Sequence, residues 1–263
     1  MDVSARANTT VIDSFAIHYI YSVMKSGPRP WKDGRSKEIT FIVTKDCQLA
    51  CKYCYLVGKN SNERMSWATA KRAVDYILSL DREELCEQDS VVFDFIGGEP
   101  FLEIDLIDRI CDYLEMQMCR LNHHWAESYM FSMTTNGINY DSCKVQEFIK
   151  KHASHLSITI TLDGTPQKHN LNRIWKSTNL CKEGGRGSYD DVARNNPLWL
   201  SQFPNAATKV TISSADIPYI CESVLHLFGL GIHNVNINCV FENVWSPDDD
   251  VLFEQQLRML ADA

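Results

Sequence analysis

Residues 44–58 read TKDCQLACKYCYLVG and place three cysteines, Cys47, Cys51 and Cys54, in the spacing C-x3-C-x2-C. The apolar run at 39–43 just before them is bounded by charged residues and predicts a strand. Thiolates are soft ligands that suit zinc or iron–sulfur clusters. Structural zinc sites and ordinary ferredoxin-type clusters take four protein ligands, and the next cysteine in the sequence is Cys86. The triplet therefore favours a four-iron cluster with one iron left open for a small molecule.

With Tyr53 just before its last cysteine, this motif resembles the signature of the radical S-adenosylmethionine (radical SAM) enzymes. The resemblance implies that the amino and carboxylate groups of S-adenosylmethionine (SAM) chelate the open iron. It also implies that one electron from the cluster cleaves the sulfonium, and that a 5′-deoxyadenosyl radical then takes a hydrogen from the substrate. A zinc knuckle and three unrelated core thiols are the alternatives.

Composition limits the classes of protein that this chain can be. Its 263 residues fit a single α/β barrel, and 26 basic against 34 acidic residues give a formal net charge of −8. That charge argues against nucleic acid as a partner, although it leaves a local basic groove open. The ten cysteines are mostly scattered, and no apolar stretch follows the polar residues 1–8 as in a signal peptide. We therefore expect a reducing cytoplasm, no membrane span, and buried thiols at Cys111 and Cys221.

From residue 38 onward, strand and helix signals alternate, which predicts βα units and a mainly parallel sheet. Strands are expected at 38–44, 91–96, 128–134, 156–162, 209–213 and 234–240. Apolar spacing predicts helices that begin near Ser66, before 107, after Asp141 or Ser142, at 189, at Asp216 and at Ser246–Pro247. The fourth of these helices is expected to cover 189–201. Six βα units agree with the (βα)6 partial TIM barrel that the resemblance implies, with a radical SAM core domain at 38–263.

The two ends of the chain are less clear. Residues 1–37 are expected to form an N-terminal extension, in which the apolar stretch 11–24 could be a strand or a helix covering one barrel end. Nothing after the sixth expected helix could hold the cysteine-rich C-terminal extension (SPASM or twitch domain) of the peptide-modifying branch. Either the enzyme lacks that extension, or these residues are the core of a longer protein.

Gly97, Gly98, Glu99 and Pro100 follow the second expected strand. Ligands of α/β barrels bind at the carboxyl ends of strands, and glycines let a backbone approach a ligand closely. A plain Gly-Gly turn is the alternative. One βα unit after the cysteines, this stretch resembles the GGE motif of the radical SAM family, which receives the methionine amino group of SAM.

Thr161 and Asp163 end the fourth expected strand, where a hydroxyl and a carboxylate can bind ribose hydroxyls. A strand-ending Asx turn is the alternative. The pair resembles the Ser-x-Asp-Gly motif of the peptide-modifying branch, with threonine in place of serine; the resemblance implies contacts to the ribose and carboxylate of SAM. Asn136, at the end of the third expected strand, is a further cofactor candidate or a turn residue.

The next residues read DG-x-P-x2-H-x3-R and end at Arg173. They resemble the same branch, which includes anaerobic sulfatase-maturating enzymes and ribosomal-peptide maturases. Arg173 could pair with a carboxylate of SAM or of the substrate, whereas it and His169 could equally be surface or structural residues. The longer segment 165–188 is expected to be a loop, and its glycine-rich part (182–189) could be a lid or a linker.

The resemblance implies an enzyme that cleaves SAM reductively and modifies a peptide or protein, for example by crosslinking a ribosomally synthesised peptide. A one-electron donor such as a flavodoxin or a ferredoxin is then a partner. A small-molecule or tRNA-modifying radical SAM enzyme is one alternative, and a non-catalytic, zinc-stabilised binding module is another. The sequence identifies no catalytic base. The family places the adenine and part of the substrate pocket at the end of the sixth strand, near Asn238, Glu242 and Trp245.

Overall fold

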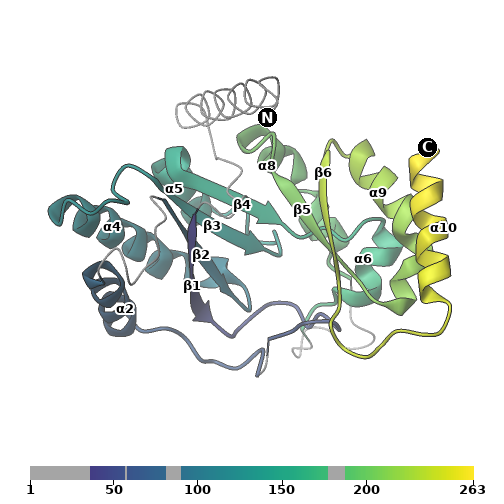
Figure 1. Ribbon diagram of the computed structural model, residues 1–263, viewed down its shortest axis with the longest axis horizontal. Helices are drawn as coiled ribbons and strands as arrows, with labels where there is room; N and C mark the ends of the chain where they lie inside the picture. Colours follow the sequence, from purple (N-terminus) through teal and green to yellow (C-terminus); the bar gives the residue numbers. More distant parts are fainter. Residues whose placement is uncertain (1–35, 57, 81–89, 177–186) are drawn as a thin grey trace, which may run out of the picture.

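The computed structural model describes residues 36–56, 58–80, 90–176 and 187–263. Within them six strands alternate with helices along an arc (Figure 1). The strands are β1 (Lys37–Thr44), β2 (Val91–Gly97), β3 (Tyr129–Thr135), β4 (Leu156–Ile160), β5 (Ala207–Ile212) and β6 (Asn234–Cys239). The α-helices are α2 (Trp67–Ser79), α4 (Ile104–Arg120), α5 (Cys143–His152), α6 (Pro166–Asn172), α7 (Tyr189–Ala193), α8 (Asn196–Gln202), α9 (Ile220–Gly229) and α10 (Asp249–Ala261). Three 3-10 helices are η1 (Pro100–Glu103), η2 (Ala153–His155) and η3 (Ser214–Tyr219).

The strands form two parallel sheets, one in the order β1-β2-β3-β4 and one of β5 and β6. The buried side chain of Thr208 on β5 bridges them. Its hydroxyl donates to the carbonyl of Ile160 at 2.7 Å and accepts from the amide of Leu162 at 3.0 Å. The arc therefore continues from β4 to β5 through side-chain hydrogen bonds instead of a backbone ladder.

The register of the first sheet alternates apolar and polar rows, because successive residues of a strand point to opposite faces. One row, on the helix-covered face, contains Phe41, Phe95, Met133 and Ile158. The adjacent row, on the opposite face, contains Thr40, Asp94, Ser132 and Ser157. Bulky apolar side chains fill the interior of a closed TIM barrel, so a polar inner face indicates a cavity wall.

Several expectations about the helices are confirmed. Ser66 caps α2 by accepting from the amide of Thr69 at 3.1 Å, and α5 begins directly after Ser142. Cys111 on α4 and Cys221 on α9 are buried thiols, as their apolar stripes predicted.

The expected loop at 165–188 is wrong at its start, because it contains α6. Thr165 accepts from the amide of Lys168 at 3.3 Å and Pro166 occupies the first turn, which together start a helix. The single helix expected at 189–201 is instead α7 followed by α8. Pro197 has no N–H to continue α7, and it lies in the first turn of a new helix.

The last two helices begin differently from the prediction. Asp216 does not open the fifth helix but closes a capping box with Ser213 at the start of η3, and α9 follows at Ile220. The sixth helix does not begin at Ser246, because the carboxylate of Asp249 accepts the Ser246 amide at 2.7 Å and holds a turn there. That helix, α10, begins at Asp249 after a left-handed residue, Asp248, with φ of 71°.

Some expectations lie outside the described residues. These are the apolar stretch 11–24, nearly all of the extension at 1–37, and the glycine-rich loop up to residue 186. The domain division at residue 38 stays a prediction. Among the described helices, none combines the length and apolar character that crossing a bilayer requires.

Candidate cofactor and active site

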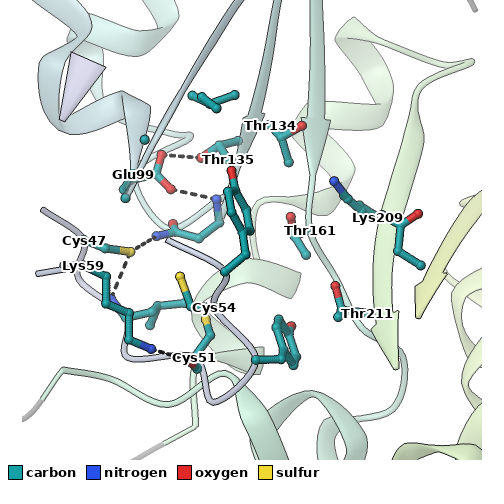
Figure 2. A pocket seen from close by; sticks show the side chains of 18 of the residues that line it. Cys47, Cys51, Cys54, Lys59, Glu99, Thr134, Thr135, Thr161, Lys209 and Thr211 are labelled. Atoms are coloured by element: carbon teal, nitrogen blue, oxygen red, sulfur yellow. Dashed lines mark hydrogen bonds between the residues drawn. The ribbon is translucent and has the colours of Figure 1, made fainter. Parts of the chain in front are cut away.

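Three cysteines on the loop after β1 line one cavity of about 440 Å³ at the carboxyl end of the strands. Figure 2 shows the sulfur atoms of Cys47, Cys51 and Cys54 gathered on one side of it. The Cys47 sulfur accepts from the amide of Leu49 at 3.3 Å and from Asn136 Nδ2 at 3.7 Å. Hydrogen bonds of this kind tune the potential of iron–sulfur clusters. Three thiols that face one cavity fit a cluster with an open iron.

Burial raises the pKa of the Cys47 thiol to about 12, and the nearby carboxylate of Glu99 adds to this effect. Burial also raises the pKa of Cys51, against the opposing charge of Arg173. Both groups are therefore protonated in the metal-free protein. Because metals bind thiolates, loading the site releases protons.

The two glycines of the GGEP stretch fix the cysteine loop to the end of β2. The amide of Gly98 donates to the Thr44 carbonyl, and that of Glu99 donates to the Asp46 carbonyl, both at 2.8 Å. A Cβ atom on Gly98 would lie 2.1 Å from the Asp46 carbonyl oxygen, and one on Gly97 would lie 2.3 Å from that of Thr44. Both glycines also line the cavity. Glycine is therefore needed here for close backbone packing beside the cysteines, a requirement that neither the predicted approach of a ligand nor a plain Gly-Gly turn includes.

Glu99 connects the ends of β2 and β3 at the wall of the cavity. Its buried carboxylate accepts from the amides of Phe101 (3.1 Å) and Asn136 (2.8 Å) and from the Thr135 hydroxyl (2.6 Å). Burial raises its pKa, although these three hydrogen bonds favour the charged form. Pro100 is buried at the start of η1 and does not line the cavity.

Asn136 has both of the roles that the sequence left open. Its Oδ1 accepts from the amide of Ile138 at 2.9 Å, as a turn residue does. Its Nδ2 donates to Gln48 at 3.0 Å and to Cys47, on the cavity wall.

The segment after α6 holds the other side of the cysteine loop. The amide of Ala50 donates to the Ile174 carbonyl at 2.8 Å, and that of Lys52 donates to the Asn172 carbonyl at 3.1 Å. Arg173, between these two acceptors, is only 6% exposed and lines the cavity. Its Nη1 donates to the Tyr53 hydroxyl at 3.0 Å, whereas its buried Nε has no hydrogen-bond partner among the described residues. Arg173 thus lines the cavity, and its Nε–H has no acceptor among the described residues.

Asp163 does not face the cavity as the ribose prediction required. It is fully buried, and its carboxylate accepts from the Tyr53 hydroxyl and, at 3.2 Å, from the amide of Thr211. The ammonium of buried Lys168 lies 3.9 Å away. Thr161 does line the cavity (Figure 2). Of the two residues after β4, Thr161 therefore lines the cavity, whereas Asp163 holds Tyr53.

His169 has the structural role that was the alternative for it. Its Nδ1 accepts from the Asp163 amide at 3.2 Å, and its Nε2 lies 2.9 Å from the Ser188 hydroxyl. At the end of β6, Asn238 and Glu242 line the cavity as expected, but Trp245 does not.

Sequence reasoning missed several residues that line the cavity. Glu38, Asp94 and Lys209 come from β1, β2 and β5, and Cys239 comes from β6. Their signal in the sequence is weak: Asp94 and Lys209 are each a polar residue between two apolar or β-branched ones, as in Phe93–Asp94–Phe95, and Glu38 and Cys239 lack even that pattern. Alternation alone marks such a residue as solvent-facing, and only the arc of strands turns it toward a shared cavity.

Comparison with known proteins identifies the chain. A model of the family described as a 4Fe-4S single cluster domain matches residues 33–180. The chain belongs to this 4Fe-4S single cluster domain family. An uncharacterized protein of Methanocaldococcus jannaschii is 29% identical to it over 202 residues, which are 77% of this chain and 62% of that protein. The expected iron–sulfur cluster is thereby confirmed, and the zinc-stabilised module loses its support.

Solved structures confirm the partial TIM-barrel fold of this chain. Native anSMEcpe, an anaerobic sulfatase-maturating enzyme with bound AdoMet and the Cp18Cys peptide, matches with a TM-score of 0.63 at 18% identity. The match covers 86% of this chain and 58% of that one. Streptococcus suis SuiB bound to its precursor peptide SuiA matches with a TM-score of 0.53 at 13% identity, over 86% of this chain and 46% of SuiB. AdoMet is SAM, so the ligand of anSMEcpe agrees with the second expected cofactor. This chain spans about three fifths of the length of the M. jannaschii protein and of anSMEcpe.

Proposed function

We propose that this 4Fe-4S domain cleaves SAM reductively and uses the resulting radical to modify a peptide or protein. The observation that carries the proposal is one cavity with the thiols of Cys47, Cys51 and Cys54 at one end and polar strand residues beyond them. Held by those thiolates, a four-iron cluster with an open iron would supply the electron for the cleavage.

The surrounding residues would hold SAM. The backbone at Gly97 and Gly98 lies beside the cysteine loop, where it would meet the methionine ammonium. Arg173 has a buried Nε on the cavity wall that no described residue accepts from, and it would pair with a carboxylate. The Thr161 hydroxyl would contact the ribose. Asp163 would act indirectly, because its carboxylate holds the Tyr53 hydroxyl.

The peptide part of the proposal has two supports. The core fold is shared with structures described as bound to peptides. In addition, β6 pairs only with β5 among the described strands, and β1 pairs only with β2 apart from a bridge at its end between Thr44 and Arg64. The arc therefore has open edges at β6 and along the first part of β1. An extended peptide can add to such an edge by backbone hydrogen bonds. The reaction on the peptide would be thioether or carbon–carbon crosslinking, or oxidation of Cys or Ser. A flavodoxin or ferredoxin would supply the electron.

The test is anaerobic reconstitution with iron, sulfide, SAM and a reductant, followed by incubation with the small peptides encoded beside the gene. We expect a peptide to lose about two daltons, as removal of two hydrogens requires, and to lose nothing when Cys47 is replaced by alanine. Cys119→Ala is the matched control, because Cys119 is an exposed thiol on α4 outside the cavity. Turnover of only a nucleoside, a tRNA or another small molecule would refute the peptide proposal.

A further inference from the structure

The inner wall of the cavity carries charged residues that the proposed SAM site does not use. Glu38 on β1, Asp94 on β2 and Lys209 on β5 all line it. The register pairs Thr40 with Asp94, so Glu38 lies one inward position before Asp94 on the neighbouring strand. Among the described residues, none of the three charges has an ion-pair partner within 4.0 Å. Figure 2 shows Lys209 reaching into the cavity from its own strand, across from Thr134 and Thr161.

The balance of charge on this wall favours a cation. Burial raises the pKa of Asp94, and the neighbouring carboxylate of Glu38 raises it further, against a hydrogen bond from Ser132 and the charge of Lys209. Two carboxylates thus share the wall with one ammonium. A positively charged group placed between Glu38 and Asp94 would relieve their repulsion, because like charges in one site disfavour each other.

An aromatic ring lines the same cavity as these carboxylates. Tyr55, just after Cys54, lines the cavity and is 68% exposed. An aromatic face next to carboxylates is a common environment for an ammonium or a guanidinium.

We propose that Glu38, Tyr55 and Asp94 form a specificity site that receives a lysine or arginine side chain of the substrate. This rests on the proposed function, since the substrate is the peptide that enters this cavity. Glu38 and Asp94 lie before the carboxyl ends of their strands, whereas the cysteines lie beyond the end of β1. A basic side chain held there points into the depth of the barrel and keeps its neighbouring residue near the cysteine end. Because Lys209 already supplies one positive charge against the two carboxylates, the wall has room for only one basic side chain of the substrate.

A minimal probe tests this site without turnover. Acetyl-lysine methylamide and acetyl-norleucine methylamide differ only in the ammonium group, and saturation-transfer NMR with the cluster-loaded protein yields the Kd of each. We expect the lysine probe to bind about tenfold or more tightly than the norleucine probe, as for hydrogen-bonded charge pairs. The preference should be lost in the Glu38→Gln/Asp94→Asn double variant, should shrink in Tyr55→Leu, and should grow in Lys209→Met. Glu254→Gln removes an exposed carboxylate on α10 and should leave the preference unchanged.

Equal Kd values for the two probes, or a preference that survives in the double variant, would overturn the site. Formation of 5′-deoxyadenosine by the wild-type protein without peptide, measured in parallel, reports on the proposed function separately. If SAM is not cleaved while the lysine preference holds, the proposed function fails and the cation site stands.

Discussion

Gly98 is the residue at which a single methyl group should have the largest effect on the cluster. Its added Cβ would lie 2.1 Å from the carbonyl oxygen of Asp46, the residue before Cys47, so the loop must move. We predict that Gly98→Ala lowers the free energy of unfolding by about 1–3 kcal/mol, as overpacking does, and loses most of its iron. Iron content after anaerobic reconstitution and the urea midpoint measure this.

Gly229→Ala is the matched control for that substitution. Gly229 ends α9, and a Cβ there meets nothing within 4 Å among the described residues. This variant should keep its iron and should be as stable as the wild type or slightly more stable. If Gly98→Ala behaves like Gly229→Ala, the packing role assigned to Gly98 is wrong.

Tyr53 bridges two buried charged side chains. Its hydroxyl donates to Asp163 and accepts from Arg173, and both of these charged side chains are buried. Tyr53→Phe leaves them without that partner, which should cost about 1–3 kcal/mol of unfolding free energy. Urea denaturation measures the loss, and Tyr76→Phe, at a tyrosine 65% exposed on α2, should show none of it. Equal stability of the two variants would contradict the bridging role of Tyr53.

At the scale of elements, Thr208 is expected to hold β4 and β5 together. Thr208→Val keeps the shape of the side chain but removes the hydroxyl that bonds Ile160 and Leu162. We predict a loss of about 1–3 kcal/mol and faster hydrogen exchange at the Leu162 amide. Thr211→Val, three residues further along β5 and on the opposite face of the strand, is the control, because its hydroxyl faces the cavity (Figure 2). Unchanged protection of Leu162 in Thr208→Val would refute the bridge.

The packing of α4 against α5 should depend on pH through His152. Burial lowers the pKa of this histidine, but hydrogen bonds to Glu115 and Asp108 outweigh burial, so its folded-state pKa is raised. The stabilisation is then fully present below the unfolded pKa of about 6.5 and is lost as pH rises through the folded value. We predict that the difference in urea midpoint between wild type and His152→Gln shrinks from about pH 6 upward. A difference that is constant or grows with pH would contradict this assignment.

Local signals were enough to predict most elements, and long-range contacts decided the rest. The caps at Ser66 and Ser142 and the alternation of strands depend on neighbours in sequence, so they could be read directly. Thr165 and Pro166 carried an equally local start signal for α6, which the expectation of a loop overlooked. By contrast, the burial of Asp163 away from the cavity depends on Tyr53, which is 110 residues earlier. The cavity role of Lys209 likewise depends on the whole arc.

For the whole molecule, the cavity is the feature that joins the two ends of the arc. Its wall takes residues from β1, β2 and β3 on one side and from β5 and β6 on the other, while the cysteine loop and the segment after α6 cover one end. In Figure 1 the helices α2 and α4 lie at one end of the arc and α9 and α10 at the other. A single site built from such distant parts of the chain is lost as a whole if the cysteine loop is displaced.

The most direct test of the account is iron content and SAM cleavage in one pair of variants. After anaerobic reconstitution, wild type and Cys119→Ala should each bind about four irons per chain and release 5′-deoxyadenosine from SAM. The Cys47→Ala/Cys51→Ala/Cys54→Ala variant should bind no cluster and release none. A triple variant that keeps its iron and cleaves SAM, or a wild-type protein that holds stoichiometric zinc instead of iron, would contradict the account.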